Sequence, residues 1–305
     1  VQPKTAKKTE TRSVKSAERV LDLFEAIGAS DDGVSFTQLG QQLGIPKSSL
    51  FALLEIIEAR GYILLNPVSR KYALGIRTWE TGQAFQRNHS VLEYAAVVLE
   101  EIVQAVNETA QLARLVGHEC VYLAKNESSH PLRLQSEIGM RLQAHATGVG
   151  KAIMAVLDDA EINRLYKTDN LPVYTPQTLI DVPALLTDLA ETRARGFAVD
   201  NAEYTPGVFC LAVPVYKASG TVTTALSVSV PTMRATPKGL ARVLEVISRG
   251  SCDLSKRLGR IRPDPTLMKL CDPAEAAAAI SALTASNRYN MDFVQVPGSV
   301  KHSSR

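Results

Sequence analysis

The sequence has few of the features that secreted, metal-binding or membrane proteins depend on. Its 305 residues include only four cysteines, which stand far apart without a C-x-x-C pair. That spacing argues against a zinc knuckle or a disulfide framework. No apolar run approaches the roughly 18 residues of a membrane span, and the first residues lack the apolar core of a secretory signal. We therefore expect a cytoplasmic protein in a reducing compartment, with no contact to a membrane.

Charge is nearly balanced over the whole chain but is concentrated at its start. The formal net charge is +3, and residues 1–20 contain six basic and two acidic residues. A basic segment with few apolar residues is expected to be flexible alone and attracted to polyanions. We predict a basic flexible arm over 1–12, and a simple solubilising tail is the alternative.

The next sixty residues follow a recognisable order of elements. Helical spacing of apolar residues predicts helices over 14–27, 36–43 and about 47–60. The tripeptide "GIP" at 44–46 separates the last two, and 62–75 reads as two short β segments around the polar turn "NPVSRK". Helix, tight turn, helix and hairpin together form the pattern of a winged helix-turn-helix domain, which binds duplex DNA.

The helix that begins at Lys47 has an unusual outer face. Leu50, Leu53, Leu54 and Ile57 form its apolar stripe, whereas the opposite face begins with a cation and two hydroxyls and continues with an aromatic and a small residue: Lys47, Ser48, Ser49, Phe51 and Ala52. A helix N-terminus favours phosphate, and an aromatic side chain can touch a thymine methyl. The alternative is an ordinary polar helix start with Phe51 packed on a neighbour.

The hairpin turn adds two cations, Arg70 and Lys71. On a winged domain they would contact the DNA backbone or the minor groove. Together with the basic arm they favour DNA binding over the alternative of an ordinary helix with a polar start.

Beyond the hairpin the pattern changes from helical to alternating. Residues 78–107 look mostly helical and form a connector, and after residue 109 the apolar period becomes two. Strands are predicted at 109–117, 120–125, 132–136, 196–200, 208–216 and 222–230, and helices at 148–157, 159–166, 183–195 and 238–257. This composition predicts an α+β domain with an antiparallel sheet. We expect 260–305 to be a loosely held tail with one short helix at 272–283 and no assigned function.

The segments "SVKSAERVLDLFEAI", "VSFTQLGQQLGIPKSSLFALLEIIEARGYI" and "RKYALG" resemble the N-terminal domain of IclR-type transcriptional regulators. Likewise "RLQAHATGVGKAIMA", "RARGFAVDNAEYTPGVFCLAVPV" and "ALSVSVP" resemble that family's effector-binding domain. The resemblance covers about 13–259 and implies the following organisation: a winged helix-turn-helix domain over 13–76, a linker helix over 77–90 and a GAF-like effector domain over 91–259. It also implies homodimers and often tetramers on the operator.

Two neighbouring positions depart from the family pattern. Many members carry a bulky polar residue followed by arginine where this chain has Phe51 and Ala52. A base contact by arginine at position 52 is therefore impossible, and the operator sequence cannot be assumed to be the common one. Base reading would instead depend on Ser48, Ser49 and the hairpin.

The resemblance also implies a pocket for a small organic metabolite. The family's pocket maps onto Leu134, Leu142, Gly148, Val149, Asp200, Val208, Cys210, Val222, Ser227 and Ser229. Strand alternation places Ser227 and Ser229 on one face, where unpaired buried hydroxyls would cost roughly 1–3 kcal/mol each. A polar ligand would satisfy them, and N–H groups at the helix start near Gly148 could receive a carboxylate. We expect a small acid or aromatic catabolite as effector. The alternative is that both serines bond to neighbouring backbone and Gly148 merely packs.

Nucleotide and metal binding find no support in the motifs. "HATGVGKA" lacks the glycine of a phosphate loop where His145 stands and its hydroxyl residue where Ala152 stands. His118, His130 and His145 are scattered without an i, i+4 pair. We predict neither a metal site nor a cofactor.

Two other classes of protein remain as alternatives. Cys210 in a pocket with Asp200 nearby would suit a GAF-like thiol enzyme, although no residue presents itself as the activating base. The second domain would otherwise be a pure interaction module that only dimerises. We predict a regulator and not an enzyme.

Overall fold

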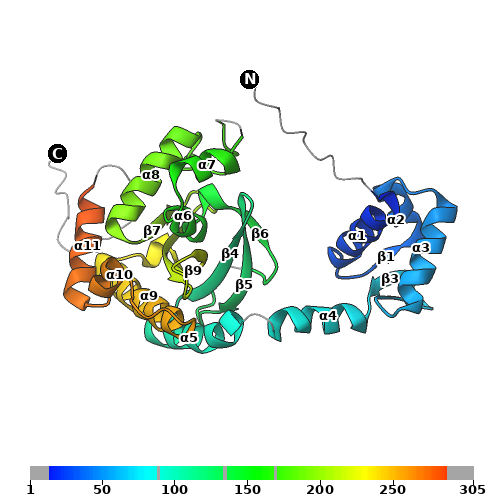
Figure 1. Ribbon diagram of the computed structural model, residues 1–305, viewed down its shortest axis with the longest axis horizontal. Coiled ribbons are helices and arrows are strands. Elements are labelled where there is room, and N and C mark those ends of the chain that lie inside the picture. The colour runs from blue at the N-terminus through cyan, green and yellow to red at the C-terminus, as the bar shows by residue number, and fades with distance from the viewer. Residues whose placement is uncertain (1–13, 88–89, 133–135, 168–169, 287–305) are drawn as a thin grey trace, which may run out of the picture. The chain divides into compact units, whose positions relative to one another are not determined.

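The computed structural model describes residues 14–87, 90–132, 136–167 and 170–286 (Figure 1). The chain divides into two compact units between His89 and Ser90, and each unit has its own hydrophobic core. The basic arm predicted at 1–12 lies outside the described residues.

The first unit contains the predicted helices and hairpin and one short strand more. Its elements are α1 (Lys15–Gly28), β1 (Val34–Ser35), α2 (Phe36–Leu43), α3 (Lys47–Ala59), β2 (Ile63–Leu65), β3 (Lys71–Leu74) and α4 (Ile76–Arg87). The strands form an antiparallel sheet in the order β1-β3-β2. Strand β1 was not predicted, because two residues are too few to show an alternating pattern. It is defined by its pairing with β3.

Local capping explains where α2 begins and ends. The Ser35 hydroxyl accepts the N–H of Gln38 at 3.3 Å, and the Gln38 side chain accepts the N–H of Ser35 at 2.9 Å. This capping box satisfies two donors of the first turn. Gly44 ends the helix in the left-handed region at φ 61°, a conformation that glycine adopts without strain. The two features fix the turn that leads into α3.

The second unit is built on one six-stranded antiparallel sheet. Its strands are β4 (Thr109–Val116), β5 (Glu119–Asn126), β6 (Arg141–Gln143), β7 (Ala198–Asn201), β8 (Val208–Tyr216) and β9 (Val222–Pro231), in the order β6-β5-β4-β9-β8-β7. Most of the predicted strand at 132–136 lies outside the described residues. The described strand after β5 is β6, which was not predicted.

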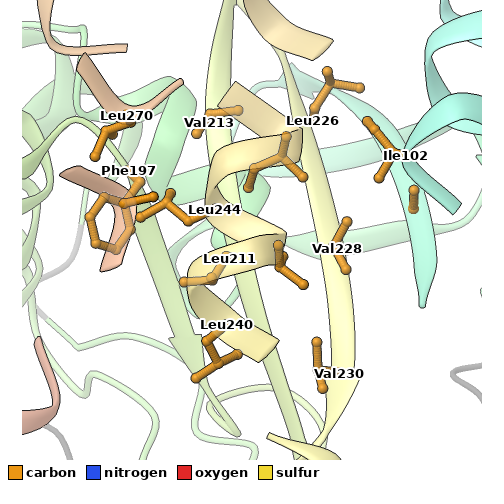
Figure 2. Close-up of a cluster of buried hydrophobic side chains, with 14 of the residues drawn as sticks. Ile102, Phe197, Leu211, Val213, Leu226, Val228, Val230, Leu240, Leu244 and Leu270 are labelled. Atoms are coloured by element: carbon orange, nitrogen blue, oxygen red, sulfur yellow. The ribbon is translucent and has the colours of Figure 1, made fainter. Parts of the chain in front are cut away.

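Helices cover both faces of this sheet (Figure 1). One face carries α5 (Ser90–Val106) and α9 (Pro237–Arg257), and the other carries α6 (Gly148–Met154) with α7 (Asp159–Leu165) and α8 (Val182–Arg195). Figure 2 shows the first of these interfaces, where Leu211 and Val213 of β8 and Leu226 of β9 lie beneath Leu240 and Leu244 of α9. Burying a leucine side chain contributes about 1.5–3 kcal/mol, so this layer is a main source of stability.

The expectation of a loosely held tail is wrong for the described part after residue 264. Two helices, α10 (Pro265–Leu270) and α11 (Pro273–Ala285), pack on α9 and bury Leu267, Leu270 and Ile280 in the same core. Each helix begins with an aspartate N-cap followed by proline, which is a strong start signal. Their apolar stretches are too short for periodicity to reveal that they dock. Residues 287–305 lie outside the described residues.

Candidate DNA interface and effector site

The N-terminus of α3 is uncapped and open to solvent. Its N-cap is Pro46, whose side chain has no acceptor, and the first helical bond runs from the Leu50 N–H to the Pro46 carbonyl at 2.9 Å. Lys47 and Ser48 are exposed, and Ser49 is half-buried. The first helical N–H groups and two polar side chains are thus presented together, which is an arrangement suited to an anion.

The outer face of α3 is apolar and exposed. Leu50 and Leu54 are buried in the core of the first unit, whereas Phe51 is 61% exposed and Ala52 is exposed beside it. Phe51 therefore does not pack into a neighbouring cluster, which was the alternative for this residue. An exposed aromatic next to a small residue leaves room for close approach of a partner.

A side-chain bridge shapes the turn between β2 and β3. The Asn66 carboxamide oxygen accepts the N–H groups of Val68 at 2.9 Å and Ser69 at 3.0 Å. Arg70 follows in the left-handed region at φ 57°, and its N–H donates to the Asn66 carbonyl at 2.9 Å. Arg70 is exposed at the turn, while Lys71 is half-buried at the start of β3 opposite Ser35. The turn thus projects Arg70 more openly than Lys71.

In the second unit the strand register brings several of the predicted site residues into one row. Asp200 of β7 pairs with Cys210 of β8, which pairs with Ser229 of β9, and one step along, Ala212 pairs with Ser227. Directly paired residues point to the same face of a sheet. The Cys210 Sγ lies 3.2 Å from the Ser229 Oγ, within hydrogen-bond distance. Asp200, Cys210 and Ser229 therefore lie in one row across the sheet, with Ser227 on the neighbouring rung of the same face, and we call these four residues the polar row.

Helix α6 covers this row at Gly148. A Cβ at that position would lie 3.3 Å from the Cβ of Ala212 and 3.6 Å from that of Cys210, so the absent side chain lets the helix approach the sheet. The N–H of Gly150 already donates to the Thr147 hydroxyl at 3.3 Å. The geometry thus supports close packing as the role of Gly148 and gives no support to a free N–H cradle for a carboxylate.

Gln111 of β4 is the partner of both serines. Its side-chain oxygen accepts the hydroxyl of Ser227 at 3.2 Å and that of Ser229 at 3.3 Å, and its amide nitrogen donates to the Ser136 hydroxyl at 2.7 Å. Sequence reasoning missed this residue. The available signal was a lone amide in the apolar stretch "TAQLARLV". Its orientation and its hydroxyl partners depend on a pairing between residues 116 and 118 positions apart.

The remaining predicted pocket residues lie at different places. Val149 is buried on α6, Leu142 packs into the same hydrophobic cluster from β6, and Val208 is half-buried at the start of β8. Val222 also joins that cluster, but it pairs with Tyr216 at the opposite end of the β8–β9 ladder from Ser229. Leu134 lies outside the described residues.

Lys151, Glu203 and Asp188 form a buried ion cluster next to the polar row. The Lys151 side chain is fully buried, and its Nζ lies 2.6 and 2.7 Å from the two carboxylate oxygens of Glu203 and 3.4 Å from the Oδ2 of Asp188. The Glu203 N–H donates to the Asp200 Oδ1 at 2.8 Å, which links the cluster to the row. The sequence offered Lys151 only as part of a failed phosphate-loop motif, and its partners are distant in the chain.

Burial changes the acidity of the groups around this cluster. Desolvation first and the nearby Glu203 carboxylate second raise the pKa of Asp200 to about 7, although Lys151 opposes the shift. Burial likewise raises the pKa of Glu203. The pKa of the Cys210 thiol stands well above its ordinary value, because of burial first and the Asp200 carboxylate second. A thiol in that environment is protonated at neutral pH, which works against the thiol-enzyme alternative.

No metal or membrane feature stands out in the part of the chain that is described. His145 is buried, its Nε2 lies 2.9 Å from the Pro172 carbonyl, and desolvation lowers its pKa. Over the described ranges, histidine, cysteine and acidic side chains form no cluster of three or more that could hold a metal ion. Of the described helices, none combines the length and the apolar character needed to cross a membrane.

Together, a helix-turn-helix unit with an exposed helix start and a sheet unit with a covered polar row define a DNA-binding transcriptional regulator. The family model of the IclR helix-turn-helix domain matches residues 16–67, and that of the bacterial transcriptional regulator IclR C-terminal domain matches 83–256. The chain belongs to the IclR family.

Two curated relatives support the same assignment. The chain is 35% identical over 246 residues to the HTH-type transcriptional regulator XynR of Escherichia coli (strain K12), covering 81% of this chain and 98% of that protein. It is 31% identical over 242 residues to the HTH-type transcriptional regulator BhcR of Paracoccus denitrificans, covering 79% and 86%.

Solved structures share the fold. An IclR transcriptional regulator from Alicyclobacillus acidocaldarius superposes with a TM-score of 0.72 at 21% identity, covering 81% of this chain and all of that one. An IclR homolog from Microbacterium hydrocarbonoxydans, complexed with 4-hydroxybenzoate, gives 0.69 at 22% identity, covering 80% and 97%. The predicted α+β class, with an N-terminal winged helix-turn-helix and an antiparallel effector-type domain, is confirmed.

Proposed function

We propose that the first unit binds an operator in double-stranded DNA and that a small organic effector in the second unit modulates this binding. The observation that carries the proposal is the uncapped, exposed start of α3, with Lys47 and Ser48 beside free helix N–H groups. Such an end favours phosphate through hydrogen bonds and through its positive dipole. Helix-turn-helix domains place this part of the second helix in the major groove.

The proposed contacts divide by position. Lys47 and Ser48 bind backbone phosphate, and Ser49, Phe51 and Ala52 face the base edges. Arg70 and Lys71 bind the backbone or the minor groove from the hairpin. Phe51 suits a thymine methyl, and Ala52 allows the helix to approach closely.

Fluorescence anisotropy tests the DNA half directly. The full chain is titrated onto a labelled duplex from upstream of its own gene and onto a scrambled duplex, at several salt concentrations. Specific binding should be roughly 10³-fold or more tighter than binding to the scrambled duplex. Equal, weak binding to every upstream duplex would contradict sequence reading by α3.

Lys47→Ala should weaken binding to the operator and to the scrambled duplex alike. Loss of one phosphate contact should reduce the slope of log affinity against log salt by about 1. Lys238→Ala removes an exposed lysine of the second unit and is the matched control, which should leave both quantities unchanged. An unaltered salt slope for Lys47→Ala would contradict the phosphate contact.

For the effector we propose a small acid or aromatic catabolite that contacts the polar row under α6. The support is the row itself, because Ser227, Ser229 and Gln111 place three hydrogen-bonded polar groups side by side on the sheet face that α6 covers. A solved IclR homolog of the same fold holds 4-hydroxybenzoate, which makes this acid a sensible first probe.

The double substitution Ser227→Ala with Ser229→Ala should weaken the response to the effector and spare DNA binding. Loss of both hydroxyls leaves the Gln111 oxygen short of donors, which should raise the effector concentration for half response about 10-fold or more. The measurement is operator anisotropy against a panel of organic acids that includes 4-hydroxybenzoate. Ser219→Ala, in the exposed turn before β9, is the control. An intact response in the double variant would place the effector elsewhere.

We propose further that the protein acts in the cytoplasm as a homodimer, with tetramers forming on DNA. Leu21, Ile76 and Trp79 of the first unit are each more than half exposed, which supports self-association of that unit. Dimers suit operators with two half-sites. The effector would change the relative affinity for two spacings of the DNA-binding units, with α4 as the connecting lever. We assign no catalytic step, since Cys210 is buried and protonated.

A further inference from the structure

Two cysteines meet at the junction between α9 and the C-terminal helices. Cys252 lies in the second half of α9, and Cys271 is the residue that ends α10. Their sulfur atoms are 3.8 Å apart, and neither residue is fully buried. We propose that Cys252 and Cys271 are a reversible oxidation site, where peroxide or a small disulfide converts the two thiols into an intramolecular disulfide.

The geometry needs only a small closure. A disulfide bond is about 2.0 Å long, so the sulfur atoms must approach by a little less than 2 Å. Cys271 stands at the end of a six-residue helix and not within a long rigid one, and its thiol also lies 3.2 Å from the Leu267 carbonyl. A rotation of its side chain at that helix end can bring it from this carbonyl to Cys252.

The two thiols differ in reactivity. The pKa of Cys271 is lowered, first by its hydrogen bond with Cys252 and then by the nearby Arg249 guanidinium, while burial and Glu245 oppose this effect. The Arg249 Nε also donates to the Cys271 carbonyl at 2.9 Å, which holds the cation close. The pKa of Cys252 is raised, first by its hydrogen bond to Cys271. Cys271 is therefore the attacking thiolate and Cys252 the thiol that resolves the product.

Both cysteines are partly exposed, and one of them borders a cavity that small oxidants can enter. Cys252 lines a surface cavity of about 510 Å³ together with Lys256, Arg260 and Met268. Cys120 and Cys210 make an internal contrast, because both are buried and burial raises the pKa of Cys120 to about 12. Reaction should select the half-exposed pair and spare the two buried thiols.

The chemistry balances with hydrogen peroxide as oxidant. The Cys271 thiolate attacks one peroxide oxygen, the O–O bond breaks, and a sulfenic acid forms with release of water after proton transfer. The Cys252 sulfur then attacks the sulfenic sulfur, the S–S bond forms, and a second water leaves. Overall, two thiols lose two electrons and two protons, and the peroxide becomes two waters. An added dithiol reverses the reaction by exchange.

The bond would join the family domain to a segment outside it. Cys252 lies inside the matched region 83–256, and Cys271 lies beyond it in the α10–α11 segment. That segment supplies Leu267, Leu270 and Ile280 to the core against α9. Closing a loop between residues 252 and 271 restricts the unfolded chain, and oxidation should therefore strengthen the attachment of these helices.

The test uses the full chain, peroxide and thiol-specific alkylation under denaturing conditions. Oxidised protein should lose the mass of two hydrogens, and peptide mapping should find Cys252 joined to Cys271 with Cys120 and Cys210 free. The thermal midpoint should rise by roughly 5–10 °C and return on addition of dithiothreitol. Free thiols at both positions after peroxide, a disulfide between two chains, or a bond to Cys120 or Cys210 would overturn the proposal.

Single variants separate the two roles. Cys252→Ser should stop the reaction at the sulfenic acid of Cys271, which dimedone traps, and Cys271→Ser should yield no adduct at Cys252. The variant with both serines should keep the reduced protein's thermal midpoint within a degree or two and lose its response to peroxide. Dimedone labelling at Cys252 in place of Cys271 would overturn the assignment of the attacking thiol.

Discussion

Replacing Lys151 with methionine should destabilise the second unit by about 3–5 kcal/mol. The Lys151 ammonium is fully buried and neutralises Glu203 at 2.6 Å, with Asp188 at 3.4 Å on its other side. Methionine fills a similar volume but leaves two acidic groups buried without their cation. Removing one partner of a buried pair costs far more than the pair itself contributes, because the remaining charge keeps its desolvation penalty.

Chemical denaturation followed by circular dichroism measures this loss. Asp253→Asn is the matched control, because it breaks the exposed pair of Asp253 and Arg257, 2.7 Å apart, and should cost less than about 1 kcal/mol. Adding Glu203→Gln to Lys151→Met should recover part of the stability. The double variant no longer buries the carboxylate that lies nearest to Lys151 in the wild type. A loss below 1 kcal/mol for Lys151→Met would show that the buried cation is not required.

Raising the pH from 5 to 8 should lower the stability of the wild-type protein, and Asp200→Asn should remove most of that decline. The Asp200 carboxyl has a pKa of about 7 in the folded protein and an ordinary value of 3.8. Between these values the unfolded chain has already released this proton while the folded protein still holds it. The stabilising contribution of the protonated Asp200 is therefore complete below about pH 4, declines as the pH rises, and is gone above pH 7, a total loss of roughly 4 kcal/mol.

The variant removes the titration of Asp200 together with its repulsion of Glu203. Asparagine keeps an oxygen for the Glu203 N–H, 2.8 Å from Asp200 in the wild type, and carries no charge. Buried His145, whose pKa is lowered, remains in both proteins and cancels in the difference, whereas Glu203 interacts with Asp200 and its response to the substitution is part of the measured difference. The variant should be slightly more stable than the wild type at pH 5, and this difference should grow as the pH rises to 8. If the unfolding free energies of the two proteins changed with pH in parallel across this range, the raised pKa of Asp200 would be contradicted.

Local chemistry accounts for the parts of the fold that were predicted correctly. Ser35 and Gln38 form a capping box at the start of α2, and Gly44 ends that helix. Gly196 ends α8 in the left-handed region at φ 82°. These signals act within four residues of the boundary they set, and for that reason a single sequence reveals them. Strands β8 and β9 were predicted for a similar reason, since alternation over nine or ten residues is strong evidence for a strand.

Partners that meet across the sheet had no such local signal. Gln111 bonds to serines 116 and 118 positions later, and Lys151 bonds to Glu203, 52 positions later. Docking of α10 and α11 on α9 was missed because α10 has only six residues and the alanine-rich sequence of α11 is apolar on all sides, so neither shows a distinct buried face. The contact of Cys252 with Cys271 depends on that docking.

By itself the sequence determined the family, the order of helices and strands, and which residues alternate onto a common face, because each of these follows from short-range periodicity, capping or a motif. Only the tertiary structure decided which polar groups are neighbours. It paired the two serines with Gln111, buried Lys151 between two carboxylates and brought Cys252 against Cys271. The physical reason is that desolvation and hydrogen bonding act between atoms in contact, and those contacts are set by strand register and helix packing.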